Sequence, residues 1–110
     1  MNPNDLIYIG LNSKVIALRK TDGTIIWETK LQSGLGADFV TLHVEASHVF
    51  AYTMGQLYCL DAATGQKLWQ NALRGYGFGF ASLATTSGST SPIPPAIQAQ
   101  TDATTSPPST

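Results

Sequence analysis

Two histidines and a glutamate are the side chains whose types and spacing come closest to a metal site. His43 and His48 flank Glu45, and imidazole and carboxylate groups bind divalent metals. These three groups could form a small metal site, particularly if the symmetry of an oligomer repeated them. We favour the simpler interpretation, in which both histidines lie at the edge of a loop and bind no metal.

Other reactive residue types lack the partners that catalysis requires. Cys59 is the single cysteine, so no internal disulfide forms, and we expect it to be a small buried side chain rather than a reactive thiol. Gly75–Gly79 reads Gly-Tyr-Gly-Phe-Gly, yet it has neither the lysine nor the strand-to-helix context of a phosphate loop. No serine nucleophile motif is present. The chain is therefore predicted not to be an enzyme, with no catalytic, cofactor-binding or metal residues.

A repeat of 42 residues organises the chain. A shift of 42 places aligns Lys14–Trp27 with Gln56–Trp69 without a gap, and both segments end on tryptophan. Along both copies, runs of branched and aromatic residues alternate with Gly, Asn and Asp turn signals, a pattern typical of short antiparallel strands. The strands are predicted at Leu6–Leu11, Val15–Leu18, Ile25–Thr29, Phe39–Glu45, Val49–Thr53, Leu57–Asp61, Lys67–Asn71 and Phe80–Thr85.

These strands divide into two repeats, residues 6–31 and 39–73, and a final strand at 80–85. With the strands of one repeat named A to D, the chain runs B-C-D, A-B-C-D, A, and Gly34–Asp38 is expected to be a crossing loop. The predicted fold is all-β, with strands enough for two four-stranded antiparallel sheets. We expect the last A strand to pair with an incomplete B-C-D sheet, either its own or a neighbour's.

The composition changes abruptly at Ser87. Residues 87–110 contain five of the six prolines among Ser, Thr, Ala and Gln, with one charge at Asp102. Such a segment buries too little apolar surface to offset the entropy of ordering. We predict a domain at residues 1–86 and a disordered tail at 87–110, with Ser91–Pro95 as an alternative Pro-rich ligand for another domain.

The repeated motif resembles the pyrroloquinoline quinone (PQQ) enzyme repeat, a β-propeller blade with the signature Ala-x-Asp-x-x-Thr-Gly-x-x-x-Trp. The second copy departs from it only at Cys59, whereas the first copy has Arg19 and Asp22 at the Asp and Thr positions. The small residue is expected to lie under a bulky ring, and both faces of each sheet are expected to be apolar and covered by neighbouring sheets. The structural motif comprises Ala17, Gly23, Trp27, Cys59, Asp61, Thr64, Gly65 and Trp69.

The resemblance implies an assembly larger than one chain. Propellers typically have about four to eight blades, so two blades cannot close a ring. We predict self-association into a homo-trimer or a homo-tetramer, and the family's preference for eight blades favours the tetramer. The rival interpretation is that the sequence is a piece of a longer propeller.

A non-catalytic role follows from the same resemblance. We predict a protein-interaction or structural scaffold without a cofactor, for which a protein or peptide is a further candidate partner. The alternative is a fragment of a PQQ-dependent quinoprotein oxidoreductase, since the base, calcium ligands and paired cysteines that the resemblance implies cannot be placed here. A third alternative is an intermediate of repeat amplification that has no selected function.

Charge and hydropathy exclude two classes of partner. The formal net charge is −1 and the six basic residues are scattered, which is unlike a nucleic-acid-binding surface. No apolar run approaches the roughly 20 residues of a membrane-spanning helix. Residues 1–5 have no basic segment of the kind that opens a secretory signal, so the compartment is unknown, and cytoplasmic if the chain is full-length.

Overall fold

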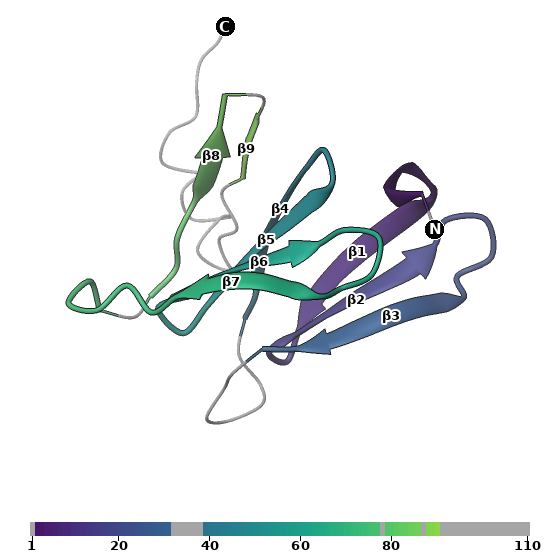
Figure 1. Cartoon of the computed structure of the whole chain (residues 1–110). Coiled ribbons are helices and arrows are strands. Elements are labelled where there is room, and N and C mark those ends of the chain that lie inside the picture. The colour runs from purple at the N-terminus through teal and green to yellow at the C-terminus, as the bar shows by residue number, and fades with distance from the viewer. Residues whose placement is uncertain (1, 32–38, 78, 87, 91–110) are drawn as a thin grey trace, which may run out of the picture.

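Short antiparallel strands make up nearly all of the regular structure (Figure 1). The computed structural model describes residues 2–31, 39–77, 79–86 and 88–90. A short 3-10 helix, η1 (Pro3–Asp5), precedes a three-stranded sheet, a four-stranded sheet and a hairpin. The strands are β1 (Leu6–Leu11), β2 (Lys14–Arg19), β3 (Ile25–Lys30), β4 (Thr41–Glu45), β5 (His48–Thr53), β6 (Gln56–Asp61), β7 (Lys67–Asn71), β8 (Leu83–Thr85) and β9 (Gly88–Thr90).

The all-β prediction, with three and then four consecutive antiparallel strands, is confirmed. Two strands begin later than predicted. β4 starts at Thr41 because the Phe39 carbonyl accepts a hydrogen bond from the Thr53 hydroxyl, 2.8 Å away, instead of a strand amide. β8 starts at Leu83, and the Phe80 ring packs edge-on against the Phe39 ring with 5.8 Å between centroids. The expected crossing loop Gly34–Asp38 lies outside the described residues.

The end of the described chain differs from the prediction. We expected the last strand to pair with an incomplete sheet, but within this chain β8 pairs with β9, with Thr85 opposite Gly88. Gly88–Thr90 lies in the segment predicted to be a disordered tail, so that expectation does not hold for these three residues; residues 91–110 lie outside the described ranges. The hairpin lies against β4, and the four-stranded sheet separates it from the three-stranded sheet (Figure 1).

One hydrophobic core lies between the two sheets. Strand alternation places every second residue in it, as Val15 and Ala17 of β2 and Val49 and Ala51 of β5 show. Each of these four side chains is fully buried. The main cluster comprises Leu6, Val15, Ala17, Trp27, Leu31, Val40, Val49, Ala51, Tyr58, Leu60 and Ala62.

Trp27 joins the two sheets at the turn between β6 and β7. Its indole Nε1 donates a hydrogen bond to the Ala62 carbonyl at 3.1 Å, and the Tyr8 hydroxyl donates to the same oxygen at 2.9 Å. The Thr29 hydroxyl donates to the Gly65 carbonyl at 2.6 Å. The turn therefore receives three hydrogen bonds from side chains of the other sheet, while the indole itself is only 9% exposed.

The sequence of this turn explains how it forms. The Asp61 carboxylate accepts hydrogen bonds from the amides of Ala63 and Thr64, and the Gly65 amide donates to the Asp61 carbonyl at 2.7 Å. Gly65 has φ +80°, a conformation that glycine adopts without steric cost. A Cβ at this position would lie 2.6 Å from Cδ2 of Trp27. Glycine is thus required both by the backbone and by the indole that packs on it.

The two repeats place a small residue between two aromatic rings. Ala17 of β2 lies opposite Tyr8 of β1 and Trp27 of β3, whose ring centroids are 5.9 Å apart. In the second sheet, Cys59 of β6 lies opposite Phe50 and Trp69, whose centroids are 6.3 Å apart. A larger side chain at either position would separate the two rings.

The contact between Trp27 and the turn gives a test with a matched control. Gly65→Ala should destabilise the fold by about 2 to 5 kcal/mol, because it adds overpacking against the indole to the cost of a positive φ. Gly23→Ala should cost only about 1 to 2 kcal/mol, since Gly23 has φ +76° and nothing within contact distance of an added Cβ. Unfolding in urea should be measured at protein concentrations low enough that further dilution does not change the urea midpoint. Equal losses in the two variants would contradict the packing described.

Candidate interaction surfaces

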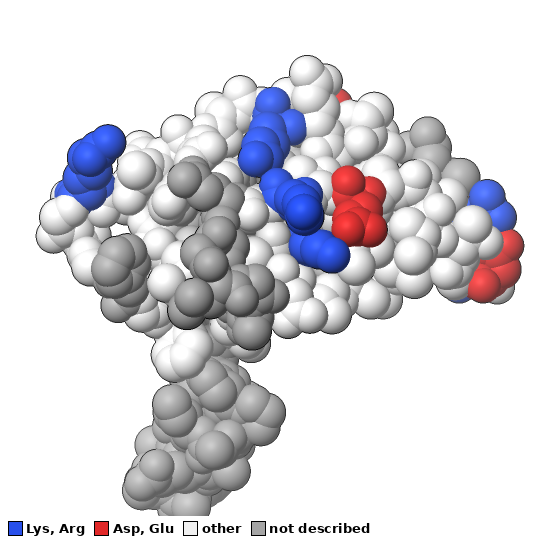
Figure 2. All heavy atoms as spheres, turned by 90° about the horizontal axis from the view of Figure 1, so that it is seen from below, with Lys and Arg blue, Asp and Glu red and all other residues white. Residues whose placement is uncertain are grey.

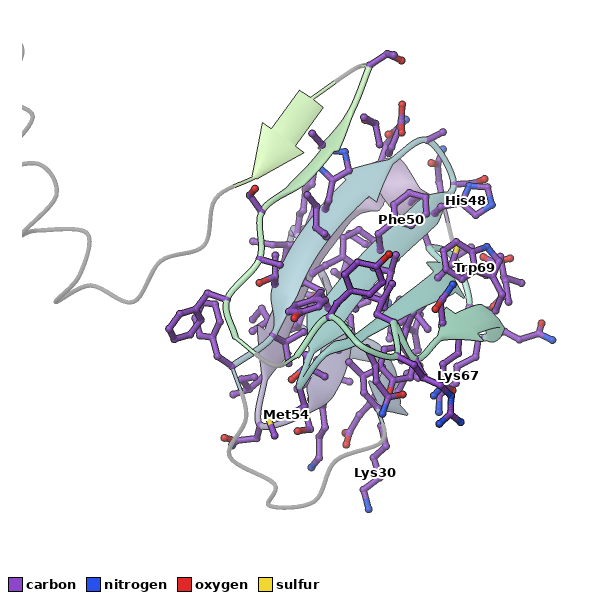
Figure 3. The ribbon with its side chains drawn as sticks, turned by 90° about the vertical axis from the view of Figure 1, so that its left-hand side faces the viewer. Lys30, His48, Phe50, Met54, Lys67 and Trp69 are labelled. Atoms are coloured by element: carbon purple, nitrogen blue, oxygen red, sulfur yellow. The ribbon has the colours of Figure 1, made fainter. Side chains whose placement is uncertain are left out.

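An exposed tryptophan marks the outer face of the four-stranded sheet. Trp69 is 47% exposed although its repeat equivalent, Trp27, is 9% exposed. Phe50 packs beside it, and the rings of His43 and His48 lie 6.4 and 6.1 Å from the Phe50 ring. Figure 3 shows Trp69, Phe50 and His48 on one side of the sheet. We call this surface, made of His43, His48, Phe50, Leu57 and Trp69, the indole face.

The β8–β9 hairpin covers part of the indole face. A hollow of about 220 Å³ lies between them, and its lining is mostly apolar. Across it, Nε2 of His43 lies 3.0 Å from Oγ1 of Thr85, within hydrogen-bonding distance. The lining residues are His43, Phe50, Leu57, Trp69, Leu83, Ala84 and Thr85. Because the hairpin lies against β4 and Trp69 is on β7, at the other edge of the sheet, the indole remains accessible.

A second exposed apolar surface lies on the outer face of the three-stranded sheet. Ile7 is 53% exposed, whereas Val49, its equivalent 42 residues later, is fully buried. Ile9 is likewise exposed where its equivalent, Ala51, is buried. We call this surface the receiving face, made of Ile7, Ile9, Ile16, Leu18, Ile25 and the turn Arg19–Gly23. The receiving face is equivalent, 42 residues earlier in the sequence, to the buried face of the four-stranded sheet that contacts Trp27.

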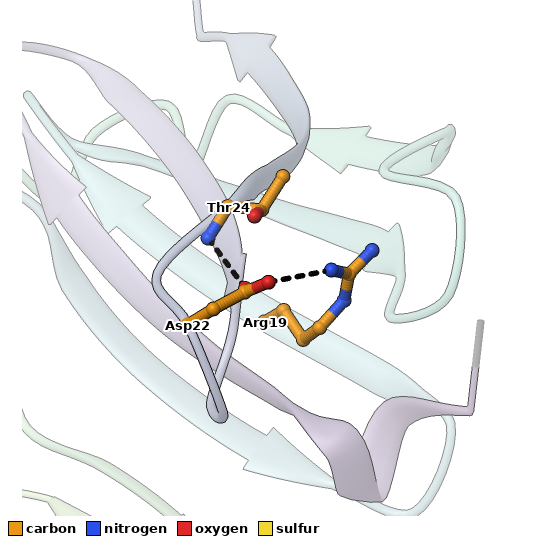
Figure 4. Close-up of polar contacts among 3 residues, drawn as sticks. All are labelled: Arg19, Asp22 and Thr24. Carbon is orange, nitrogen blue, oxygen red and sulfur yellow. Dashed lines mark hydrogen bonds and ion pairs between the residues drawn. The ribbon is translucent and has the colours of Figure 1, made fainter.

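The turn Arg19–Gly23 is ordered by charged groups. The Asp22 carboxylate accepts a hydrogen bond from the Thr24 amide at 3.0 Å and pairs with Nη1 of Arg19 at 2.8 Å (Figure 4). The hydrogen bond from Thr24, followed by the Arg19 charge, lowers the pKa of Asp22. Asp22 therefore stabilises the turn although the first repeat has lost the Asp and Thr of the signature.

The structure brings some of the predicted motif residues together and leaves others apart. Asp61, Thr64 and Gly65 form the turn that receives Trp27, whereas Trp69 and Gly23 have no such contact with each other. Ala17 and Cys59 lie in the middle of their sheets. Sequence reasoning missed Tyr8, Thr29 and Ala62, whose contribution depends on polar atoms that meet only when the sheets pack.

The residues considered for chemistry form no reactive cluster in the described ranges. No group of three or more His, Cys, Asp or Glu side chains there is placed to hold a metal ion. The glycine-rich segment Gly75–Gly79 lies between β7 and β8, which belong to different sheets; Gly75 and Gly77 have positive φ, and Phe78 lies outside the described residues. With Gln56, Gln70 and Arg74, the two glycines border an open hollow of about 650 Å³.

Charged side chains are dispersed over the surface. On the face in Figure 2, a short row of basic side chains runs beside acidic ones and forms no extended basic patch. Lys14 pairs with Glu28 at 3.4 Å on the three-stranded sheet. Within the described part of the chain, no helix has the length and apolar character that a membrane crossing requires.

Burial predicts the reactivity of the single thiol. Cys59 is 2% exposed, and desolvation raises the pKa of its thiol, so the reactive thiolate is disfavoured. In the native protein Cys59 should react with a thiol reagent much more slowly than in 8 M urea, which absorbance of the released reporter group would measure. Equal rates in the two conditions would show that the thiol is accessible in the folded protein.

Comparison with protein families connects this architecture to known proteins. A PQQ-repeat family model described as outer membrane protein assembly factor BamB matches residues 11–90. None of the curated proteins compared with the chain matches it. The matched range extends from the end of β1 to the end of β9, so it covers both copies of the repeated motif and both glycine turns. The chain belongs to the PQQ-repeat family.

Proposed function

We propose that the chain is a non-catalytic scaffold whose two sheets act as β-propeller blades and complete a larger propeller by self-association. One observation carries this proposal. The interface buried between the two sheets has two halves, and the equivalent of each half is exposed on an outer face of the chain. Trp69 is exposed where its equivalent, Trp27, is buried, and Ile7 is exposed where its equivalent, Val49, is buried. The 42-residue repeat makes these halves equivalent in sequence as well as in position.

Exposure of both faces is costly for a separate chain. Contiguous apolar surface that remains in water favours association, and an unpaired strand edge adds a second route to it. β1 pairs with β2 along one edge, and no other described strand pairs with its second edge. A neighbouring copy that covers these surfaces removes both liabilities.

The strand count supports the same arrangement. The first sheet has three strands and the second has four, and β8 lies within the segment Phe80–Thr85 that we predicted to be the last A strand. In the proposed assembly, β8 leaves β9 and adds to β1 of the next copy, which gives that sheet its fourth strand. Residues 1–86 would then supply two complete blades. Four copies make the eight blades that the family resemblance favours, and three copies make six.

A scaffold role agrees better with the matched family than an oxidoreductase role does. The description of that family names an assembly factor, which implies action through protein partners. In the part of the chain that the structure describes, no group of three or more His, Cys, Asp or Glu side chains could hold a metal ion. A protein or peptide that contacts the loop ends or channel of the assembled ring is the proposed ligand.

Solution mass tests the assembly directly. Multi-angle light scattering of the full chain should give four times, or alternatively three times, the 11.7 kDa of one chain. A chain that ends at Thr90 is the control and should keep the same number of copies, since every contact used in the proposal lies before that residue. A monodisperse mass of one chain would contradict self-association.

Cofactor binding separates the scaffold from the quinoprotein alternative. After incubation with pyrroloquinoline quinone and Ca²⁺ and removal of free quinone, the protein should retain no quinone absorbance. Omission of Ca²⁺ provides the control for non-specific retention. Stoichiometric quinone retained only with Ca²⁺ would support the oxidoreductase alternative.

A further inference from the structure

We propose that Trp69 of one copy docks on the turn Arg19–Gly23 of the next copy, in the way that Trp27 docks on Asp61–Gly65 within the chain. This inference rests on the proposed self-association and identifies the surfaces that carry it. The partner is a second copy of the same chain. The template for this contact is the interface between the two sheets of one chain. In the contact between copies, Trp69 takes the place of Trp27, and the turn Arg19–Gly23 of the next copy takes the place of Asp61–Gly65.

The two turns have the same backbone hydrogen bonds. The Gly23 amide donates to the Arg19 carbonyl at 2.8 Å, as the Gly65 amide does to the Asp61 carbonyl at 2.7 Å. The φ angles of the two glycines are +76° and +80°. The receiving turn therefore already has the conformation that accepts an indole in the other repeat.

The carbonyl that would accept the indole N–H is also equivalent. Ala62, which accepts from Trp27, has its amide bonded to the Ser47 carbonyl at 2.8 Å. Its equivalent, Lys20, has its amide bonded to the Asp5 carbonyl at 2.9 Å, and Asp5 is itself the equivalent of Ser47. The same anchor thus fixes the peptide that would receive Trp69.

The space above the receiving turn is open. An added Cβ at Gly23 meets no described residue within contact distance, whereas one at Gly65 would meet the ring of Trp27. The seat that an indole fills in the second repeat is therefore vacant in the first. Trp69, on the last strand of the second sheet, is 47% exposed and has no equivalent seat among the described residues.

Three differences distinguish the contact between copies from the contact within the chain. Phe50 replaces Tyr8 and removes one hydrogen-bond donor to the carbonyl. Asn71 replaces Thr29, and its side-chain amide can donate to the Gly23 carbonyl while its oxygen accepts from the Leu73 amide. Lys20 replaces Ala62, so its aliphatic stem must extend along the interface with the ammonium group in water.

The proposed contact is head-to-tail, because the indole and the turn that receives it lie on different sheets. Each copy then uses one surface for the preceding neighbour and the other for the following one, which closes a ring when the rotation permits. A symmetric dimer, in which Trp69 faces Trp69, would leave both receiving turns empty. The two arrangements can be separated by disabling one surface at a time.

The test uses two full-length variants, each with one surface disabled. Trp69→Ala removes the indole, and Gly23→Asn fills the seat with a residue that tolerates positive φ. Each variant alone should associate about 30-fold or more weakly than the unchanged chain, as the loss of a central aromatic contact predicts. An equimolar mixture should form a heterodimer, since one intact indole and one intact turn remain. Light scattering of the separate and mixed variants measures both effects.

Controls keep the test independent of folding and of the proposed function. Tyr76→Ala also truncates an aromatic side chain, but Tyr76 is 84% exposed and belongs to neither face, so this variant should keep the original mass. Heterodimer formation itself shows that both disabled variants are folded. If the unchanged chain is monomeric, self-association is refuted; if it is oligomeric while the variants keep its mass or fail to pair when mixed, only the head-to-tail docking is refuted.

Discussion

The seating of Trp27 on the turn Asp61–Gly65 is the contact on which the arrangement of the two sheets depends. It combines a large buried aromatic surface with hydrogen bonds to the carbonyls of Ala62 and Gly65. A buried backbone carbonyl without a partner would be costly, and here side chains of the opposite sheet satisfy it. Sheet packing and turn conformation are therefore one constraint, because neither forms well without the other.

The same constraint explains why the ends of the chain differ from its middle. In the middle, an indole and a glycine turn meet and exclude water. At the ends, among the described residues, Trp69 is not seated on a glycine turn and the Gly23 turn holds no indole. The asymmetry follows from having two repeats: one internal interface leaves two unmatched halves.

Much of this fold could be predicted from the sequence, because strands with alternating burial and turns with glycine can be recognised in short stretches of sequence. The 42-residue register located both tryptophans and both glycine turns. It did not reveal that Tyr8 and Trp27 share one carbonyl, since that depends on how the sheets pack. Nor did it reveal β9, because Gly88–Thr90 has a polar composition and becomes a strand only by pairing with β8. Association between copies leaves no local signal beyond exposed apolar residues.

The small residue in the middle of each sheet has a consequence for sequence variation. Ala17 and Cys59 occupy the floor of a gap whose width is set by the rings on either side. Size, rather than hydrophobicity, limits what evolution can place there. Related sequences should accept alanine, cysteine, serine or glycine at these two sites and should reject valine and leucine, although both are common in buried strands.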